Sequence, residues 1–178
     1  RSSDLIAGKD MAPQEISAKV LQKLKEAHTK IIFVTPYFVP HRWLIKAMRH
    51  ATERGVVVEV LIPEKTDSKI LDAINRYYIT QILREKIVVY QTKGTNHAKA
   101  GLIDQTEGLV GSANIDTLSF ERNNELGIFF TDPITVLQLS TIITQWKNEG
   151  KKLTREGYTI RWYHKFVAYV LKLIHPFL

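Results

Sequence analysis

The sequence predicts an α/β fold, in which helices lie on both sides of a largely parallel sheet. Short runs of β-branched and aromatic residues alternate along the chain with longer stretches in which apolar residues recur at helical spacing. Proline, glycine and small polar residues separate these runs and mark the turns. The length of 178 residues fits one domain, or one half of a larger two-lobed protein.

Helices are expected at four places in the first 150 residues. Their predicted ranges are 15–27, 43–54, 69–84 and 133–149. Gly55 follows the second helix, where a C-terminal cap belongs. The polar residues Thr66, Asp67 and Ser68 precede the third helix as capping residues. Residues 1–13 have no apolar period, so we expect a loose lead-in there.

Six strands are expected between and after these helices. Their predicted ranges are 31–34, 56–62, 87–90, 98–103, 109–110 and 125–130. A rigid loop, residues 36–40, follows the first strand. Open α/β sheets bind ligands beyond the ends of their strands, so Tyr37 in this loop is a candidate substrate-binding residue at the entrance of a site. An ordinary turn explains the loop equally well.

Residues 151–178 are predicted to form a segment separate from the domain of residues 1–150. The segment starts as a polar linker and continues as a helix with one apolar face. That face carries Trp162, Phe166, Tyr169, Val170, Leu173 and Ile174, and the basic residues Arg161, Lys165 and Lys172 lie largely elsewhere. Such a basic amphipathic helix suits a membrane interface, or docking on the domain or on another lobe.

Composition excludes some functions and favours others. The absence of cysteine rules out disulfides, thiolate catalysis and cysteine-bound metal centres. The net charge of +7 suggests an anionic partner, such as nucleic acid, acidic lipid or a phosphate substrate, although a basic surface can also serve solubility alone. No stretch approaches the roughly 20 apolar residues of a membrane-spanning helix. The chain starts with Arg1 rather than Met, which we interpret as a fragment or a processed form.

The most informative stretch combines a histidine, a lysine and a distant pair of polar residues at fixed spacing. It reads His97-x-Lys99, then Asp104 after four residues, then Gly111-Ser112-x-Asn114 after six more. Six fixed positions are far more specific than a lone dipeptide. A second His-x-Lys pair, His28-x-Lys30, has no such continuation and carries no functional prediction.

The spacing of this motif predicts a phosphate site. Residues two apart on a strand project from the same face, which applies to His97 with Lys99 and to Ser112 with Asn114. If the two strand ends are adjacent, these side chains converge on a small cationic pocket. Lysine then supplies charge, serine and asparagine supply neutral donors, and a neutral imidazole can attack phosphorus. The motif has no carboxylate cluster of metal-binding type, so we expect neither a metal nor a cofactor.

Two motif positions are predicted to be structural. Asp104 lies at a strand end before a Gln-Thr-Glu-Gly turn, so we expect it to fix the loop or anchor a basic residue. Gly111 is expected to permit close backbone approach. Neither residue is assigned a chemical step.

These residues resemble the HKD motif of the phospholipase D superfamily. The wider segment 111–125, with Thr35 to Pro40 and Arg76 to Tyr78, is similar to bacterial cardiolipin synthases. One departure is Leu118, where the cardiolipin synthase pattern usually has arginine. The resemblance implies a phospholipase D-like α/β/α sandwich with one HKD half.

The resemblance also implies roles for individual residues. His97 matches the motif histidine, which acts as nucleophile or general acid. Lys99 and Asn114 match the residues that hold phosphoryl oxygens, and Ser112 matches a hydrogen-bonding neighbour. Glu125 stands where the superfamily places a carboxylate against the other ring nitrogen of the histidine, fixing its tautomer.

Superfamily enzymes use two such motifs across a pseudo-two-fold axis, and this chain carries one. The resemblance therefore implies a second HKD half, from the same longer chain or from a homodimer; the start of the sequence favours the C-terminal half of a longer protein. The implied function is phosphatidyl transfer or phosphodiester hydrolysis on phospholipid through a phosphohistidine, at the anionic surface of the bacterial cell membrane. A nuclease of the same superfamily and a non-catalytic lipid-binding lobe are the alternatives.

Overall fold

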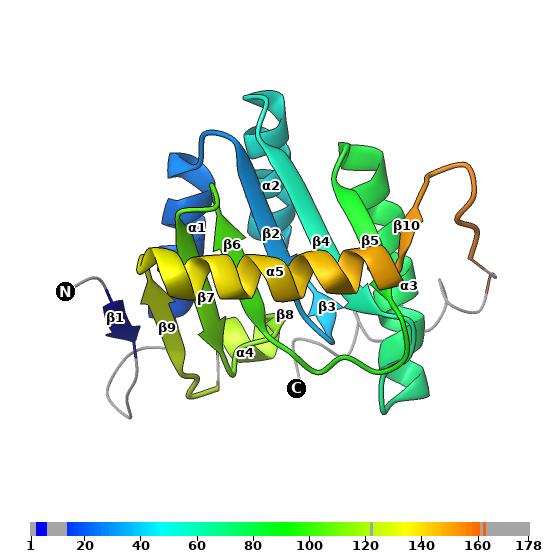
Figure 1. Ribbon diagram of the computed structural model, residues 1–178. Helices are drawn as coiled ribbons and strands as arrows, with labels where there is room; N and C mark the ends of the chain where they lie inside the picture. Colours follow the sequence, from blue (N-terminus) through cyan, green and yellow to red (C-terminus); the bar gives the residue numbers. More distant parts are fainter. Residues whose placement is uncertain (1–2, 7–13, 122, 161, 163–178) are drawn as a thin grey trace.

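A mixed sheet of eight strands forms the centre of the computed structural model, which describes residues 3–6, 14–121, 123–160 and 162 (Figure 1). In spatial order the strands are β1 (Ser3–Ile6), β9 (Gly127–Phe130), β7 (Glu107–Gly111), β6 (Ala100–Ile103), β2 (Lys30–Val34), β4 (Val57–Pro63), β5 (Val88–Thr92) and β10 (Lys151–Leu153). Two further short strands, β3 (Phe38–Val39) and β8 (Ile115–Asp116), pair with each other in parallel.

Helices cover both faces of the sheet, which confirms the α/β/α sandwich. One face packs against α1 (Gln14–Glu26), α2 (Arg42–Glu53) and α3 (Lys69–Ile82), with a 3₁₀ turn at Leu83–Glu85. The other face packs against α5 (Pro133–Glu149), which crosses the strands in Figure 1. Each face has its own apolar core, and Ile31 and Phe33 of β2 point into the first core while Ile32 and Val34 point into the second.

The expectation of a largely parallel sheet is wrong. Only the pairs β2–β4 and β4–β5 are parallel, and the remaining five pairs are antiparallel. One of the antiparallel pairs, β6–β7, is joined by a tight turn, where Asp104 and Gln105 have φ of 48° and 56° and Thr106 N donates to Ile103 O at 3.0 Å. Positive φ at both central residues matches the twist of an antiparallel hairpin.

The predicted helices agree with the structure within a few residues, whereas the two edge strands of the sheet were not predicted. Gly55 has φ of 90° just beyond α2, as expected of a C-terminal cap. Residues 3–6, predicted to be loose, form β1, and residues 151–153, predicted to be linker, form β10. Short edge strands are held by backbone pairing with β9 and β5, so their side chains need no apolar period.

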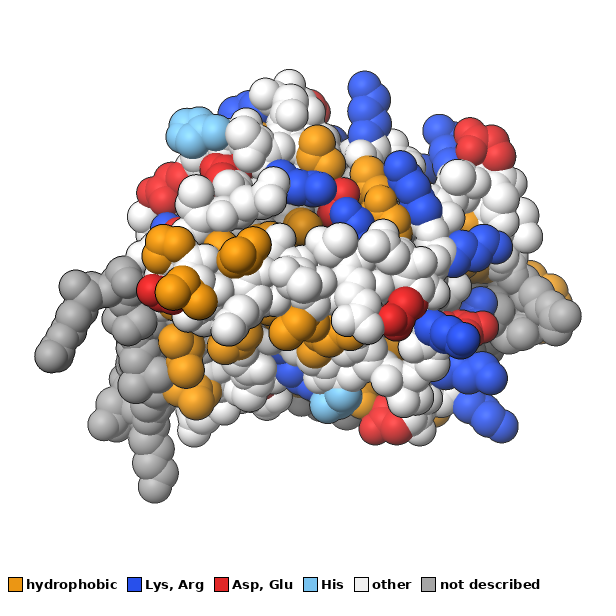
Figure 2. All heavy atoms as spheres, viewed as in Figure 1, with side chains coloured by type: hydrophobic (Ala, Val, Ile, Leu, Met, Phe, Trp, Pro, Cys, Tyr) orange, Lys and Arg blue, Asp and Glu red, His pale blue; other side chains and the backbone are white. Residues whose placement is uncertain are grey.

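One buried ion-pair cluster ties α5 to the sheet. Glu59 of β4 is almost fully buried and contacts Lys147 Nζ at 2.5 Å and Lys30 Nζ at 3.2 Å. On the outer side of α5, Ile134 and Leu137 are more than 60% exposed. Figure 2 shows apolar side chains gathered over the start of this helix.

The predicted amphipathic helix lies almost entirely outside the described residues, among which Trp162 is 77% exposed. Within the described part of the chain, no helix has the length and apolar character needed to cross a bilayer.

Candidate active site

The predicted site residues come together at the edge of the sheet where the parallel strands end. Val34 at the end of β2 pairs with Ala100 at the start of β6, and Ala100 pairs with Val110 near the end of β7. Gly111 then pairs with Gly127 at the start of β9. Four segments therefore meet here: those that follow β2 and β7, and those that precede β6 and β9.

His97 and Lys99 lie in an extended segment before β6, rather than on the strand as predicted. Strand β6 begins at Ala100. One backbone hydrogen bond, from the Gly111 N–H to Lys99 O at 3.1 Å, holds Lys99 next to the end of β7. Lys99 Nζ donates to His97 O at 2.8 Å. The exposed imidazole of His97 contacts the Tyr37 ring, with centroids 5.7 Å apart and planes at 74°.

Carboxylates surround Lys99, so the site is less purely cationic than the motif suggests. Burial lowers the pKa of Lys99, and the negative charges of Glu125, Asp116 and Asp67 oppose this effect. The last two were absent from the predicted site. Only their places along the chain could have indicated them: Asp67 closely follows β4, and Asp116 closely follows the motif asparagine.

Ser112 joins the ends of β7 and β9. Its backbone N–H donates to Leu126 O at 2.9 Å, and its hydroxyl accepts the Leu126 N–H at 2.9 Å. The same hydroxyl donates to Glu125 Oε2 at 2.5 Å. A Cβ at Gly111 would lie 2.4 Å from Leu126 O, so only glycine permits this approach.

Glu125 therefore contacts the serine of the motif and not its histidine. Among the described residues, no hydrogen bond joins Glu125 to His97. The physical reason is register: Ser112 directly follows the Gly111–Gly127 pair, which makes it the nearest donor to the segment before β9.

Asn114 lies just beyond Ser112 and carries unused hydrogen-bonding capacity. Its backbone N–H donates to Ser119 Oγ at 3.2 Å, whereas its buried Oδ1 has no partner in the described structure. Asp116 accepts the Ser119 N–H at 2.7 Å, and burial raises the pKa of Asp116 above its usual value despite these hydrogen bonds. Unpaired buried polar atoms are costly, and this one, an amide oxygen, can only accept a hydrogen bond.

Hydrogen bonds of two buried side chains fix the loop that carries Tyr37 next to the motif. Thr35 is buried, and its hydroxyl donates to Tyr37 O at 2.8 Å and accepts the Ile115 N–H at 3.1 Å. The buried Asn75 of α3 accepts the Phe38 N–H and donates to Pro36 O, both at 2.8 Å. Neither residue was among the predicted site residues, although Thr35 begins a segment that carries the resemblance, because a buried polar side chain has no periodic signature.

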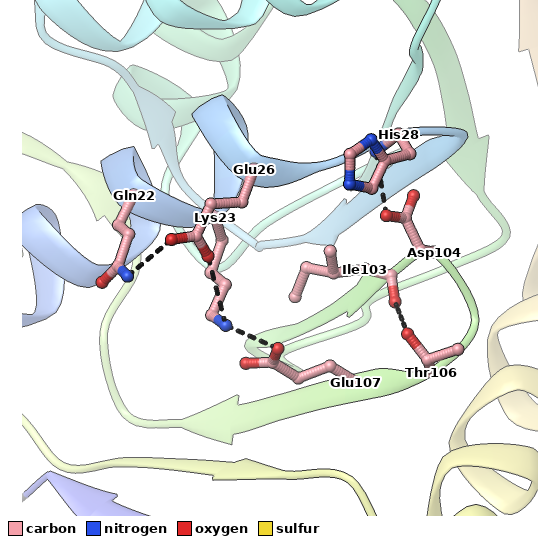
Figure 3. A network of polar contacts seen from close by, with 8 residues as sticks. All are labelled: Gln22, Lys23, Glu26, His28, Ile103, Asp104, Thr106 and Glu107. Carbon is pink, nitrogen blue, oxygen red and sulfur yellow. Dashed lines mark hydrogen bonds and ion pairs between the residues drawn. The ribbon is translucent and has the colours of Figure 1, made fainter.

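Asp104 lies at the opposite end of β6 from this site. Its carboxylate accepts the N–H groups of His28, Thr29 and Lys30 at 2.8–2.9 Å, and so fixes the loop before β2. Figure 3 shows the contact with His28. Partial burial favours a higher pKa for Asp104, but these hydrogen bonds outweigh it and lower the pKa to about 2. Nearby, Lys23 Nζ lies 2.7 Å from Glu107 and links α1 to β7.

No group of three or more His, Asp or Glu side chains in the described ranges is arranged to hold a metal ion. The fold and the motif together define a half-site of the phospholipase D superfamily. Residues 20–149 match the family model for the cardiolipin synthase PLD-like domain. The chain belongs to this family.

Curated relatives agree with this assignment. The chain is 36% identical over 152 residues to a probable cardiolipin synthase, YwiE, of Bacillus subtilis, a match that covers 85% of the chain and 30% of the relative. It is 29% identical over 160 residues to cardiolipin synthase A of Buchnera aphidicola, covering 89% of the chain and 33% of that protein. The chain thus spans about a third of the length of these relatives.

Solved structures share the fold at low identity. The phospholipase D family member Nuc of Salmonella typhimurium matches with a TM-score of 0.71 and 19% identity, over 86% of this chain and 98% of that one. Phosphatidylserine synthase of Haemophilus influenzae matches with a TM-score of 0.75 and 18% identity, over 98% of this chain and 45% of that one.

Proposed function

We propose that this domain transfers a phosphatidyl group, or cleaves a phosphodiester, on a phospholipid through a covalent phosphohistidine. The observation that carries the proposal is the meeting of His97, Lys99 and Asn114 at one edge of the sheet. An exposed imidazole beside the cationic Lys99 suits attack on an anionic phosphodiester, and the amide NH2 group of Asn114 is a donor for its oxygens.

The reaction has two balanced steps. A histidine nitrogen bonds to phosphorus while the phosphorus–oxygen bond to the first alcohol breaks, and a second histidine gives that alkoxide a proton. An acceptor alcohol or water then attacks phosphorus, the phosphorus–nitrogen bond breaks, and the second histidine takes the acceptor's proton. Lys99 and Asn114 hold the phosphoryl oxygens in both steps.

Only one motif histidine is present in the chain, so the second comes from a companion half or from another copy. His97 is nucleophile or acid according to which half this chain represents. The acceptor distinguishes a cardiolipin-forming transferase, which uses a lipid alcohol, from a phospholipase, which uses water.

Replacing His97 tests the proposal. In the form of the protein that carries two motifs, we expect His97→Ala to lower turnover of phosphatidylglycerol by about three orders of magnitude or more. The matched control is His28→Ala, which removes the histidine of the other His-x-Lys pair and leaves its backbone contact with Asp104 in place. Near-normal turnover by His97→Ala would refute the assignment.

The same assay tests the expectation that the protein's own side chains suffice. Turnover should survive exhaustive EDTA treatment; loss of activity that zinc or manganese restores would contradict the mechanism.

A nuclease function is the second candidate, favoured by the net charge of +7. Single-stranded DNA and phosphatidylglycerol vesicles should be compared as substrates of the same preparation. Cleavage of DNA with no action on lipid would replace the proposed substrate and keep the histidine chemistry.

A further inference from the structure

Asp67 and Tyr37 form a contact at the candidate site that the motif chemistry leaves unused. Tyr37 donates its hydroxyl proton to Asp67 Oδ1 at 2.5 Å. The sequence places Asp67 among the capping residues of α3, but Ser68 caps that helix, through its contact with Leu71 N. Asp67 is exposed, so this hydrogen bond is formed at the surface beside the site.

The other side of Tyr37 faces the motif histidine. The rings of Tyr37 and His97 have centroids 5.7 Å apart and planes at 74°, an edge-to-face geometry within the range that stabilises aromatic pairs. Because His97 lies in a segment without strand pairing, its imidazole depends on side-chain contacts for its orientation.

Tyr37 is itself held in place at three points. Thr35 ties its carbonyl oxygen to Ile115 of β8, Asn75 brackets the residues on both sides of it, and Asp67 holds its hydroxyl. β8 directly follows the motif asparagine, so its pairing with β3 connects the loop to the motif. A ring fixed at its backbone and at its tip presents an invariant surface to the imidazole.

The tip contact is also chemically persistent. The hydrogen bond to Asp67, together with burial and nearby negative charge, raises the pKa of Tyr37 to about 12. The phenol therefore keeps its proton, and remains a hydrogen-bond donor, at neutral and moderately alkaline pH.

We propose that Tyr37 and Asp67 act as a positioning pair for His97, in which the carboxylate fixes the phenol and the aromatic ring fixes the imidazole for its reaction at phosphorus. Neither residue forms a bond to phosphorus. The proposal rests on the function proposed above and adds to it the device that orients the reacting ring.

Spectroscopy of the 178-residue chain tests positioning without requiring activity. His97 ring signals, assigned by their loss in His97→Ala, should be sharp and shifted by the Tyr37 ring current in the wild type. Tyr37→Phe should keep the shift but broaden the signals, since the ring remains and its tether is lost. Tyr37→Ala should abolish the shift. Unchanged His97 signals in Tyr37→Ala would overturn the proposal.

Kinetics of the two-motif protein provide the second test. Asp67→Ala and Tyr37→Phe should each lower kcat about tenfold, and Tyr37→Ala up to about a hundredfold, with KM changed less than about twofold. The double variant Tyr37→Phe/Asp67→Ala should have a kcat no lower than that of the less active single variant, because both substitutions remove the same hydrogen bond. Additive losses would show that the two residues act independently, and a rise in KM with normal kcat would assign them to substrate binding; either result would overturn the proposal.

Two controls separate charge and fold from positioning. Asp67→Asn loses the charge and keeps an acceptor, so it should retain most of the activity. Glu64→Ala removes an exposed carboxylate from the same loop and should behave as wild type. If His97→Ala is fully active, the proposed function fails whatever the pair does; if His97 is essential and the pair is silent in both tests, only the positioning proposal fails.

Discussion

At Gly111, the lack of a side chain decides how closely two strand ends approach. An added Cβ would lie 2.4 Å from the carbonyl oxygen of Leu126. The neighbouring Ser112 needs this approach for its three contacts across the strands. Glycine in this motif is thus a condition for placing the serine and, through it, Glu125.

We predict that Gly111→Ala lowers the free energy of unfolding by about 1–3 kcal/mol, because the backbone must move to accept the methyl group. Thermal and denaturant unfolding measure this change. The control is Gly101→Ala, where the nearest atom to the new Cβ is at 3.5 Å. Equal stability of the two variants would contradict the steric argument.

The lowered pKa of Asp104 implies that the free energy of unfolding depends on pH in the acidic range. Its pKa is lowered to about 2 in the folded chain, against 3.8 as its ordinary value. Its contribution is therefore complete above the ordinary value and is lost as pH falls through the folded value. We expect Asp104→Ala to destabilise the chain by about 1–3 kcal/mol at pH 7. The difference from wild type should shrink between about pH 4 and pH 2, as measured by urea unfolding.

At this scale the motif residues lie together as predicted, but some of their contacts differ from those predicted. His97, Lys99, Ser112 and Asn114 do meet at one edge, because the segments that carry them directly precede β6 and follow β7, which pair with each other. The expected contact between Glu125 and His97 is absent from the described residues, since it depends on register between strands far apart in sequence. Carboxylates near Lys99, such as Asp67, belong to no motif and come together only through the fold.

At the scale of elements, the small pair β3–β8 links the loop after β2 to the motif. Its two strands have only two residues each, so side-chain hydrogen bonds stabilise it more than its own ladder does. The buried hydroxyl of Thr35 is central, since it connects Tyr37 O to Ile115 N.

We predict that Thr35→Val lowers the free energy of unfolding by about 1–3 kcal/mol, because it leaves the buried Ile115 N–H without a partner. The melting temperature should fall by about 2–4 °C for each kcal/mol. Thr80→Val is the matched control: the Thr80 hydroxyl bonds only within α3, donating to Tyr77 O and accepting from Gln81 Nε2. A smaller loss for Thr35→Val than for Thr80→Val would contradict the bridging role.

The elements themselves were predictable to different degrees. Helices such as α5, which matches its predicted bounds of 133–149, are visible because an apolar face repeats over many residues. The direction of the strands was not predicted. For β6–β7 it depends on the Asp104–Gln105 turn, whose positive φ values have no strong sequence signal without glycine or asparagine, and for the other antiparallel pairs it depends on pairing between strands far apart in sequence. The edge strands β1 and β10 are too short to show any period.

At the scale of the whole molecule, one motif histidine leaves the proposed site half complete. We predict that size-selected monomer turns over little or no phosphodiester substrate. Self-association, or supply of a companion half, should restore activity. Gel filtration followed at once by assay of each fraction measures this, and full activity in the monomer fraction would contradict a two-half mechanism.

The C-terminal segment carries a separate prediction, based on sequence. Its aromatic face and basic residues should bind vesicles that contain anionic lipid, more weakly at high salt. Truncation after Thr159 should abolish this binding, as measured by vesicle sedimentation with neutral vesicles as control. Equal sedimentation of both chains would show that the segment is not the membrane contact.

The strand order has a consequence for synthesis of the chain. β2, with the apolar sequence Ile31-Ile32-Phe33-Val34, pairs with β4 on one side and with β6 on the other. During translation its second edge stays open until residue 103 has left the ribosome, and open apolar edges invite aggregation. β6 begins directly after Lys99, so the motif segment delivers the strand that closes this edge. Nascent chains released before that point should be insoluble.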